Sequence, residues 1–171
     1  AFTGRRPPLH LDPPEHTPYR RALNPLLSRE RSDALEPVTR AIAREMLAPL
    51  VAKAGGDICA EFSSYLPVHV FGEWMKVPAE WLDTLHHAGR AFILAVHSNK
   101  PDAMKETSLS LYEMARALIR DRQDHPQDPA EDPTSALLAA RVDGEPLPEE
   151  MIVGTVRQVL VGGMVAPMVL G

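Results

Sequence analysis

Apolar residues recur at steps of three and four along most of this chain, which is the spacing of one face of an α-helix. The clearest stripe consists of Leu35, Val38, Ile42, Met46 and Leu50. Asp33 and Glu36 are placed like a capping box at its start, and Gly55-Gly56 would end it. The pattern predicts an amphipathic helix over residues 35–50.

The same spacing, with proline and glycine as breaks, predicts helices through the rest of the chain. Those after the first stripe are expected at residues 62–76, 79–97, 101–119, 132–141 and from 148 onward. Residues 120–132 contain two Asp/His-Pro breaks and read as an exposed loop. Strand-like alternation of any length does not occur, and no internal repeat is visible. The fold class is therefore predicted to be all-α, with residues 1–171 forming a single helical region.

Composition supports a globular chain, since 44% of the residues are hydrophobic and 24% are charged. Every apolar run is broken by charge, glycine or proline, so no membrane association is expected. The first residues lack the apolar core of a secretion signal, which favours a cytoplasmic location. The one cysteine, Cys59, excludes an intramolecular disulfide and a zinc site of several cysteines, and we expect it to be a small buried side chain.

The net charge of −5 is unevenly distributed. Residues 1–44 contain eight arginines against five acidic residues, a surplus of three positive charges. This surplus is too small for a nucleic-acid footprint, so no nucleic acid is expected as a partner. It would suit an acidic protein partner.

The most specific segment is Leu-Asp-Pro-Pro-Glu-His-Thr-Pro-Tyr-Arg-Arg, residues 11–21. His16 and Arg20 lie four positions apart, so they share a face if one helix carries both. Together they would form a clamp for an acidic group, with arginine supplying a planar fork that suits carboxylates. Two alternatives remain open. One is a capped helix with a solvated basic face. The other is a helix that starts at Thr17 rather than at Asp12, which would loosen the shared face.

This segment resembles the helix-C motif of bacterial cytochromes P450, the haem-thiolate monooxygenases. Gly56-Asp57-Ile58 through Val77-Pro78 is similar to the passage from helix D to helix E of that family, and Asp143-Gly144-Glu145 to the approach to helix I. The resemblance implies a partial cytochrome P450 fold, from helix C to the middle of helix I. The N-terminal sheet region and the haem-thiolate loop of the family are not in this sequence, so the chain would be part of a larger domain.

In that family, the histidine and arginine of helix C donate hydrogen bonds to a haem propionate. The resemblance therefore implies that His16 and Arg20 bind heme b (iron protoporphyrin IX). Helix I of the family carries two small residues, then an acid and an alcohol that relay protons during oxygen activation. Here Gly162 and Gly163 match the small residues and are expected to face the haem.

The acid and alcohol positions of that helix hold Val165 and Ala166. Neither side chain has an exchangeable proton, so neither can act as a general acid. Pro167 follows and would leave the carbonyl of Gly163 without its helical partner. An alternative reading of the same residues is a plain helix end, because glycine often stops a helix and proline often follows it.

The function implied by the resemblance is monooxygenation, the insertion of one oxygen atom from dioxygen into a small hydrophobic or aromatic substrate. Substrate contacts are expected from Phe92, Val96, Val161 and Ala166. Electrons would come from a ferredoxin, a flavodoxin or a reductase domain. The thiolate cysteine that binds the iron is absent, so we expect no metal ligand in this chain and no activity from the 171 residues alone.

Two other functions remain open. One is a non-enzymatic helical module that binds a ligand or a partner protein. The other is a haem protein of the same fold with peroxide-driven chemistry, favoured by the replacement of the acid–alcohol pair by Val165 and Ala166.

Overall fold

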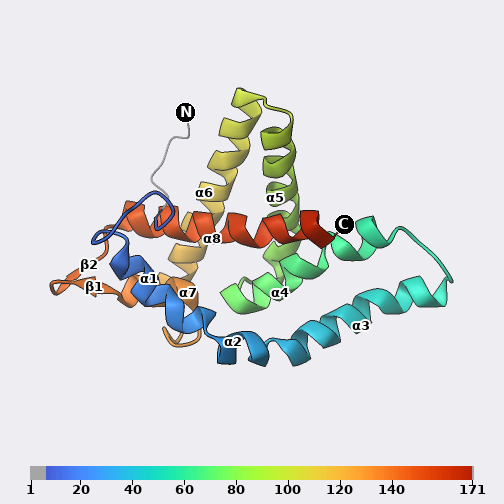
Figure 1. Cartoon of the computed structure of the whole chain (residues 1–171), viewed down its shortest axis with the longest axis horizontal. Helices are drawn as coiled ribbons and strands as arrows, with labels where there is room; N and C mark the ends of the chain where they lie inside the picture. The colour runs from blue at the N-terminus through green and yellow to red at the C-terminus, as the bar shows by residue number, and fades with distance from the viewer. Residues whose placement is uncertain (1–6, 171) are drawn as a thin grey trace.

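The computed structural model describes residues 7–170, with side chains described for residues 7–163. Within this range the regular secondary structure is helical apart from one short hairpin. The last helix, α8, runs across the middle of the molecule (Figure 1). The antiparallel pair α5 and α6 projects from one side of it, and the long helix α3 lies at the periphery, toward the end of the molecule where α8 finishes.

The helices differ widely in length, and three short 3-10 or π-helical turns, named η, lie between them. In chain order the elements are α1 (Thr17–Leu23), η1 (Asn24–Leu27), α2 (Arg29–Ala34), α3 (Glu36–Ala52), η2 (Cys59–Ser63), α4 (Leu66–Met75), η3 (Ala79–Trp81), α5 (Leu82–His97), α6 (Pro101–Asp124), α7 (Pro133–Ala139), β1 (Arg141–Val142), β2 (Glu145–Pro146) and α8 (Glu149–Leu170). The strands pair antiparallel, with Arg141 opposite Pro146. The predicted all-α class is confirmed.

The structure corrects several local predictions. The capping box is wrong: Asp33 lies inside α2, which Ser28 caps, and α3 begins after Leu35 without a side-chain cap. The segment expected as one helix over residues 62–76 is divided into the π-helical turn η2 and the helix α4. Helix α6 continues to Asp124, into the region expected to be a loop.

The expectation for Cys59 is also wrong, because its side chain is exposed. The residue opens η2, where its backbone N–H donates to the Asp57 carboxylate at 3.0 Å. Asp57 also accepts from the N–H of Ala60. The first turn of η2 lies at the surface, since residues 57–61 are all exposed.

The core lies where α8 crosses α4 and α6. Its members are buried apolar residues from these helices and from α1, α5 and α7. They include Tyr19, Leu23, Val68, Met75, Leu85, Leu118, Ile119, Leu137, Ile152, Val153, Val156 and Leu160. None of the described helices is both long and apolar enough to cross a membrane.

A buried ion pair joins the ends of three helices. The Nε of Arg122, on α6, donates to the Asp132 carboxylate at 2.9 Å, and neither side chain is more than 3% exposed. Asp132 also caps α7 by accepting from the N–H of Ser135. The Nη2 of Arg122 donates to the carbonyl of Lys76, at the C-terminal end of α4. One guanidinium therefore fixes α4, α6 and α7 relative to one another.

His86, on α5, is a second buried ionisable group. Its ring stacks on Tyr65 with 4.0 Å between the ring centroids. Burial is the main cause that holds the pKa of His86 below its usual value, and the neighbouring His87 and Arg90 act in the same direction. The folded state therefore favours the neutral imidazole at this contact between the start of α4 and α5.

Candidate functional site

His16 and Arg20 keep the spacing of a helix although α1 begins only at Thr17. His16 is the N-cap residue, with φ −75° and ψ −22°, which are α-helical values. The N–H of Arg20 donates to the carbonyl of His16 at 3.2 Å. Of the two starts that the sequence left open, the structure has the one at Thr17, yet the two residues remain neighbours one helical turn apart.

Helix α1 is held in place by two buried apolar side chains that neighbour His16 and Arg20 on the same side of the helix. Tyr19 and Leu23 are buried in the central cluster, at 4% and 3% exposure. Proline occupies the first turn at position 18, where the missing N–H costs nothing. Tyr19 lies between His16 and Arg20 in the sequence, and Leu23 follows them. By packing in the core, these two residues fix the backbone that carries both polar side chains.

The polar atoms of this pair are available for a ligand. The Nδ1 atom of His16 is buried and has no hydrogen-bond partner among the residues that the structure describes. A buried polar atom left unpaired costs about 1–3 kcal/mol. Arg20 is exposed, and within the described range its side chain forms no hydrogen bond or ion pair. An acidic group placed here would satisfy both side chains, which fits the predicted binding of a haem propionate.

The two glycines of α8 have different surroundings. The helix continues through both and through Pro167 to Leu170, so the alternative of a plain helix end at Gly162-Gly163 is wrong. A Cβ atom added at Gly163 would lie 2.4 Å from Cγ of Phe71, on α4. At Gly162 an added Cβ would meet nothing within 4 Å. Gly163 is therefore needed for helix packing, whereas Gly162 borders open space.

The predicted oxygen-activation residues Val165 and Ala166 lie on the helical part of α8, but their side chains are outside the described residues. The same holds for Ala166 as a predicted substrate contact. Their lack of an acid and an alcohol is a property of the sequence alone.

The three described substrate candidates differ in exposure. Phe92 is buried on α5, whereas Val96, one turn later, is 39% exposed. Val161 is half-buried on α8. Sequence reasoning missed the residue that contacts Phe92: the guanidinium carbon of Arg157 lies 4.8 Å from the centroid of its ring. A single arginine among the apolar residues of α8 was the signal that could have found it.

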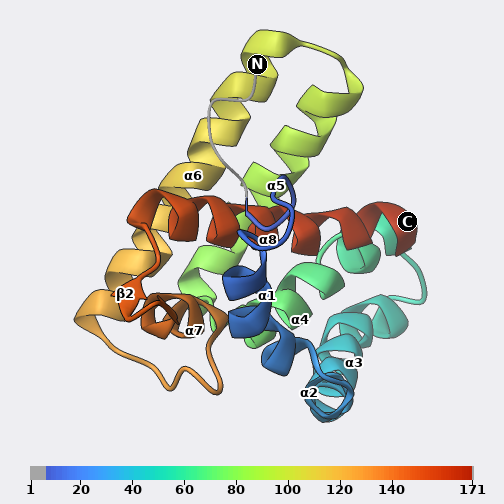
Figure 2. The ribbon, with the colours of Figure 1, turned by 60° about the vertical axis from the view of Figure 1, so that its left-hand side comes forward.

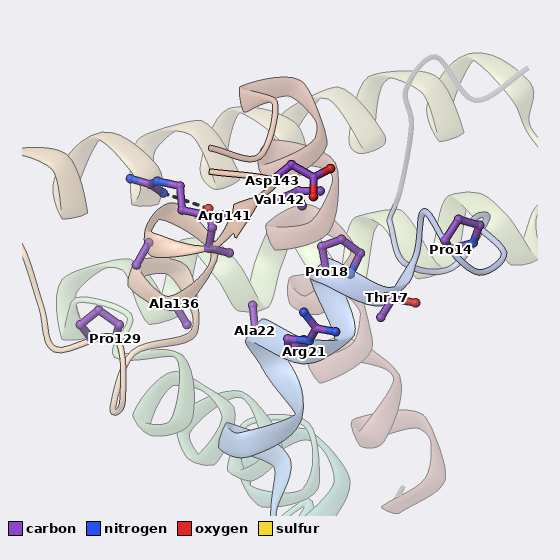
Figure 3. A pocket seen from close by; sticks show the side chains of 12 residues that line it. Pro14, Thr17, Pro18, Arg21, Ala22, Pro129, Ala136, Arg141, Val142 and Asp143 are labelled. Atoms are coloured by element: carbon purple, nitrogen blue, oxygen red, sulfur yellow. Dashed lines mark hydrogen bonds between the residues drawn. The ribbon is translucent and has the colours of Figure 1, made fainter. Parts of the chain in front are cut away.

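A cavity of about 510 Å³ lies on the other side of α1, between this helix, α7 and the hairpin. Thr17, Pro18 and Arg21 line one wall, and Arg141 with Asp143 lies across from them (Figure 3). None of the predicted site residues whose side chains are described lines this cavity. A smaller groove of about 310 Å³ runs between η1 and α4 and reaches Gly163. Helix α4 packs against α8 in this part of the molecule (Figure 2).

No family model matches the chain. Curated proteins do match over most of its length. It is 31% identical over 156 residues to the mycinamicin IV hydroxylase/epoxidase of Micromonospora griseorubida. This alignment covers 91% of this chain and 38% of that protein. It is 28% identical over 165 residues to the cyclomarin C epoxidase CymV of Salinispora arenicola, covering 94% of this chain and 41% of that protein. The chain thus spans about two fifths of the length of these relatives.

Solved structures give the same result for the fold. A mutant of the mixed-function P450 MycG in complex with mycinamicin IV superposes with a TM-score of 0.75 at 30% identity, over 96% of this chain and 41% of that one. CYP101J2 superposes with a TM-score of 0.71 at 30% identity, over 92% of this chain and 37% of that one. The order of helices and the sequence agree with the same segment of these proteins. In sequence and in fold, this chain matches about two fifths of a cytochrome P450.

Proposed function

We propose that the chain is part of a haem-thiolate monooxygenase that inserts one oxygen atom from dioxygen into a small hydrophobic or aromatic molecule. The observation that carries this proposal is the buried, unsatisfied Nδ1 of His16 one helical turn from Arg20. The names of the relatives, which include a hydroxylase and epoxidases, support the reaction class. The balance of the reaction places the second oxygen atom in water, with electrons supplied by a partner protein.

The residues of this chain would hold and enclose the cofactor rather than ligate its iron. His16 and Arg20 would donate hydrogen bonds to an acidic side arm of heme b, and the open space beside Gly162 would admit a flat group close to the backbone of α8. When bound, the haem supplies the iron that activates dioxygen. The thiolate ligand is expected from outside these 171 residues, because Cys59 lacks the sequence pattern of the family's cysteine loop.

Substrate and redox partner follow from the chemistry of the surfaces. Phe92, Val96 and Val161 are apolar, which suits a hydrophobic substrate. The first quarter of the chain has exposed arginines, among them Arg21 and Arg29, which suit an acidic ferredoxin, a flavodoxin or a reductase domain. The proposed location is the cytoplasm, without a role for nucleic acid or membrane.

The test uses the full-length protein, purified with its haem. His16→Ala removes one charge-assisted hydrogen bond to the propionate, worth about 1.5 kcal/mol. We expect haem transfer to excess apomyoglobin, followed by Soret absorbance, to become about tenfold faster, because 1.4 kcal/mol corresponds to a factor of ten. Arg29→Ala is the matched control, since Arg29 is 89% exposed and pairs only weakly with Asp33 at 3.6 Å.

Two results would contradict the proposal. One is full-length protein without a haem absorbance band, which would favour the non-enzymatic helical module. The other is a rate of haem loss that His16→Ala and Arg29→Ala change equally, which would mean that His16 does not hold the propionate.

A second candidate function is peroxide-driven chemistry on the same haem. It is favoured by Val165 and Ala166, which cannot relay protons at the positions of the family's acid and alcohol. We expect the full-length protein to form product with hydrogen peroxide but not with dioxygen and reductant if this candidate is right. Product formation from dioxygen with tight coupling to the reductant would contradict it.

A further inference from the structure

We propose that Arg157 is a positioning residue that fixes the inner wall of the substrate pocket by holding the ring of Phe92. This inference rests on the proposed function for the existence of the pocket. It goes beyond that function because neither the helix-C motif nor the glycines of α8 involve this arginine. The structure brings it together with residues of two other helices.

Arg157 is the largest side chain in the described part of the chain that is less than 2% exposed. Its guanidinium carbon lies 4.8 Å from the ring centroid of Phe92, on α5, and 5.4 Å from that of Tyr112, on α6. Both distances are within the range of cation–π attraction. Its Nη2 donates to the hydroxyl of Ser108, also on α6, at 3.0 Å. One guanidinium thus joins α5, α6 and α8.

These contacts constrain Phe92 more tightly than apolar packing would. A guanidinium is planar and stacks on aromatic faces, so its hydrogen bond to Ser108 fixes the surface against which the ring rests. A charge in a buried site is also costly unless its partners stay in place. Movement of Phe92 away from Arg157 would expose the cation to an apolar gap. The arginine therefore favours one position of the ring.

The Phe92–Arg157 contact lies next to the other predicted substrate residues. Val96 follows Phe92 by four positions on α5, and Val161 follows Arg157 by four positions on α8. Residues four apart share a face of a helix, about 6 Å from each other along it. The side chains of Phe92 and Arg157 are buried, whereas those of the two valines are partly exposed. In the substrate pocket of the proposed function, this contact would therefore form the inner wall.

This arrangement makes Arg157 a determinant of substrate size. With the arginine in place, the ring of Phe92 would be held away from the substrate space that the proposed function places beside Val96 and Val161. Without it, the ring can turn into that space, which leaves less room for a large ligand and the same room for a small one. The effect should therefore grow with the size of the ligand.

The test compares two probes, imidazole and 4-phenylimidazole, by calorimetric titration of the full-length haem protein. Arg157→Met keeps a long apolar side chain but removes the cation. We expect this variant to raise the dissociation constant of 4-phenylimidazole at least tenfold and to change that of imidazole less than twofold. Ser108→Ala keeps both ring contacts and loses only the hydrogen bond, so it should raise the dissociation constant of 4-phenylimidazole about threefold. If Arg157→Met does not fold, the same two titrations on Ser108→Ala test the inference.

A double-mutant cycle separates positioning from a purely structural role. In a Phe92→Ala background there is no ring to hold, so Arg157→Met should no longer change the ratio of the two dissociation constants. An unchanged effect in that background would overturn the inference, as would equal weakening of both probes by Arg157→Met.

Failure of the proposed function is read separately, from the Soret absorbance. Haem-free protein that binds 4-phenylimidazole with the same dependence on Arg157 would support the inference and reject the haem. Wild-type protein that shows the absorbance band but has no preference for the larger probe would overturn the inference alone.

Discussion

Replacing Asp132 by alanine is expected to lower the free energy of unfolding by about 3–5 kcal/mol, the usual cost of removing one partner of a buried ion pair. Asp132 is fully buried and is the partner of Arg122, whose side chain is itself 3% exposed. The substitution would leave the guanidinium with its remaining acceptors, Asp121 and the carbonyl of Lys76. It would also remove the cap of α7, since the N–H of Ser135 loses its acceptor.

Urea unfolding followed by circular dichroism provides the measurement. Asp128→Ala is the matched control, because Asp128 belongs to the same loop and also accepts a backbone N–H, from Ala130 at 2.9 Å, but is exposed. We expect this control to cost about 1 kcal/mol or less. An equal decrease in the free energy of unfolding for the two variants would show that burial of the ion pair does not contribute to stability. Recovery of stability in the double variant Arg122→Met with Asp132→Leu would support the account, because apolar replacement of both partners is often tolerated.

Alanine at the two adjacent glycines of α8 is expected to have effects of opposite sign. At Gly163 the new methyl group would be 2.4 Å from the ring of Phe71, so that α4 or α8 must shift. Overpacking of this kind costs about 1–3 kcal/mol. At Gly162 the methyl group meets nothing within 4 Å, and the helical preference of alanine over glycine adds up to about 1 kcal/mol of stability.

Each variant serves as the control for the other, since both make the same chemical change on the same helix. The measurement is the midpoint of urea unfolding of the haem-free protein. Destabilisation by both variants would mean that Gly162 is also in close contact with another part of the protein. The loss of stability caused by Gly163→Ala should be smaller when it is combined with Phe71→Leu, because that change removes the clashing ring. Absence of that relief would contradict the packing of α4 on α8 as the cause.

The sequence by itself determined the helical class, the places of most of the longer helices and the motif at the front of the chain. Helical spacing of apolar residues is a local property, and it located α3, α5 and α6 to within a few residues. Asp132-Pro133 was predicted to open a short helix, and α7 begins there with Asp132 as its cap. His16 and Arg20 could be singled out because proline, charge and a spacing of four residues are all visible without a fold.

The tertiary structure alone decided which side chains meet. It separated the roles of Gly162 and Gly163, which are the same residue type on one helix, because only one of them faces Phe71 of α4. It placed the Arg157 guanidinium between Phe92 and Tyr112, and it paired Arg122 with Asp132 at the junction of three helices. These contacts join segments far apart in the chain, and local periodicity has no information about which faces of two helices come together.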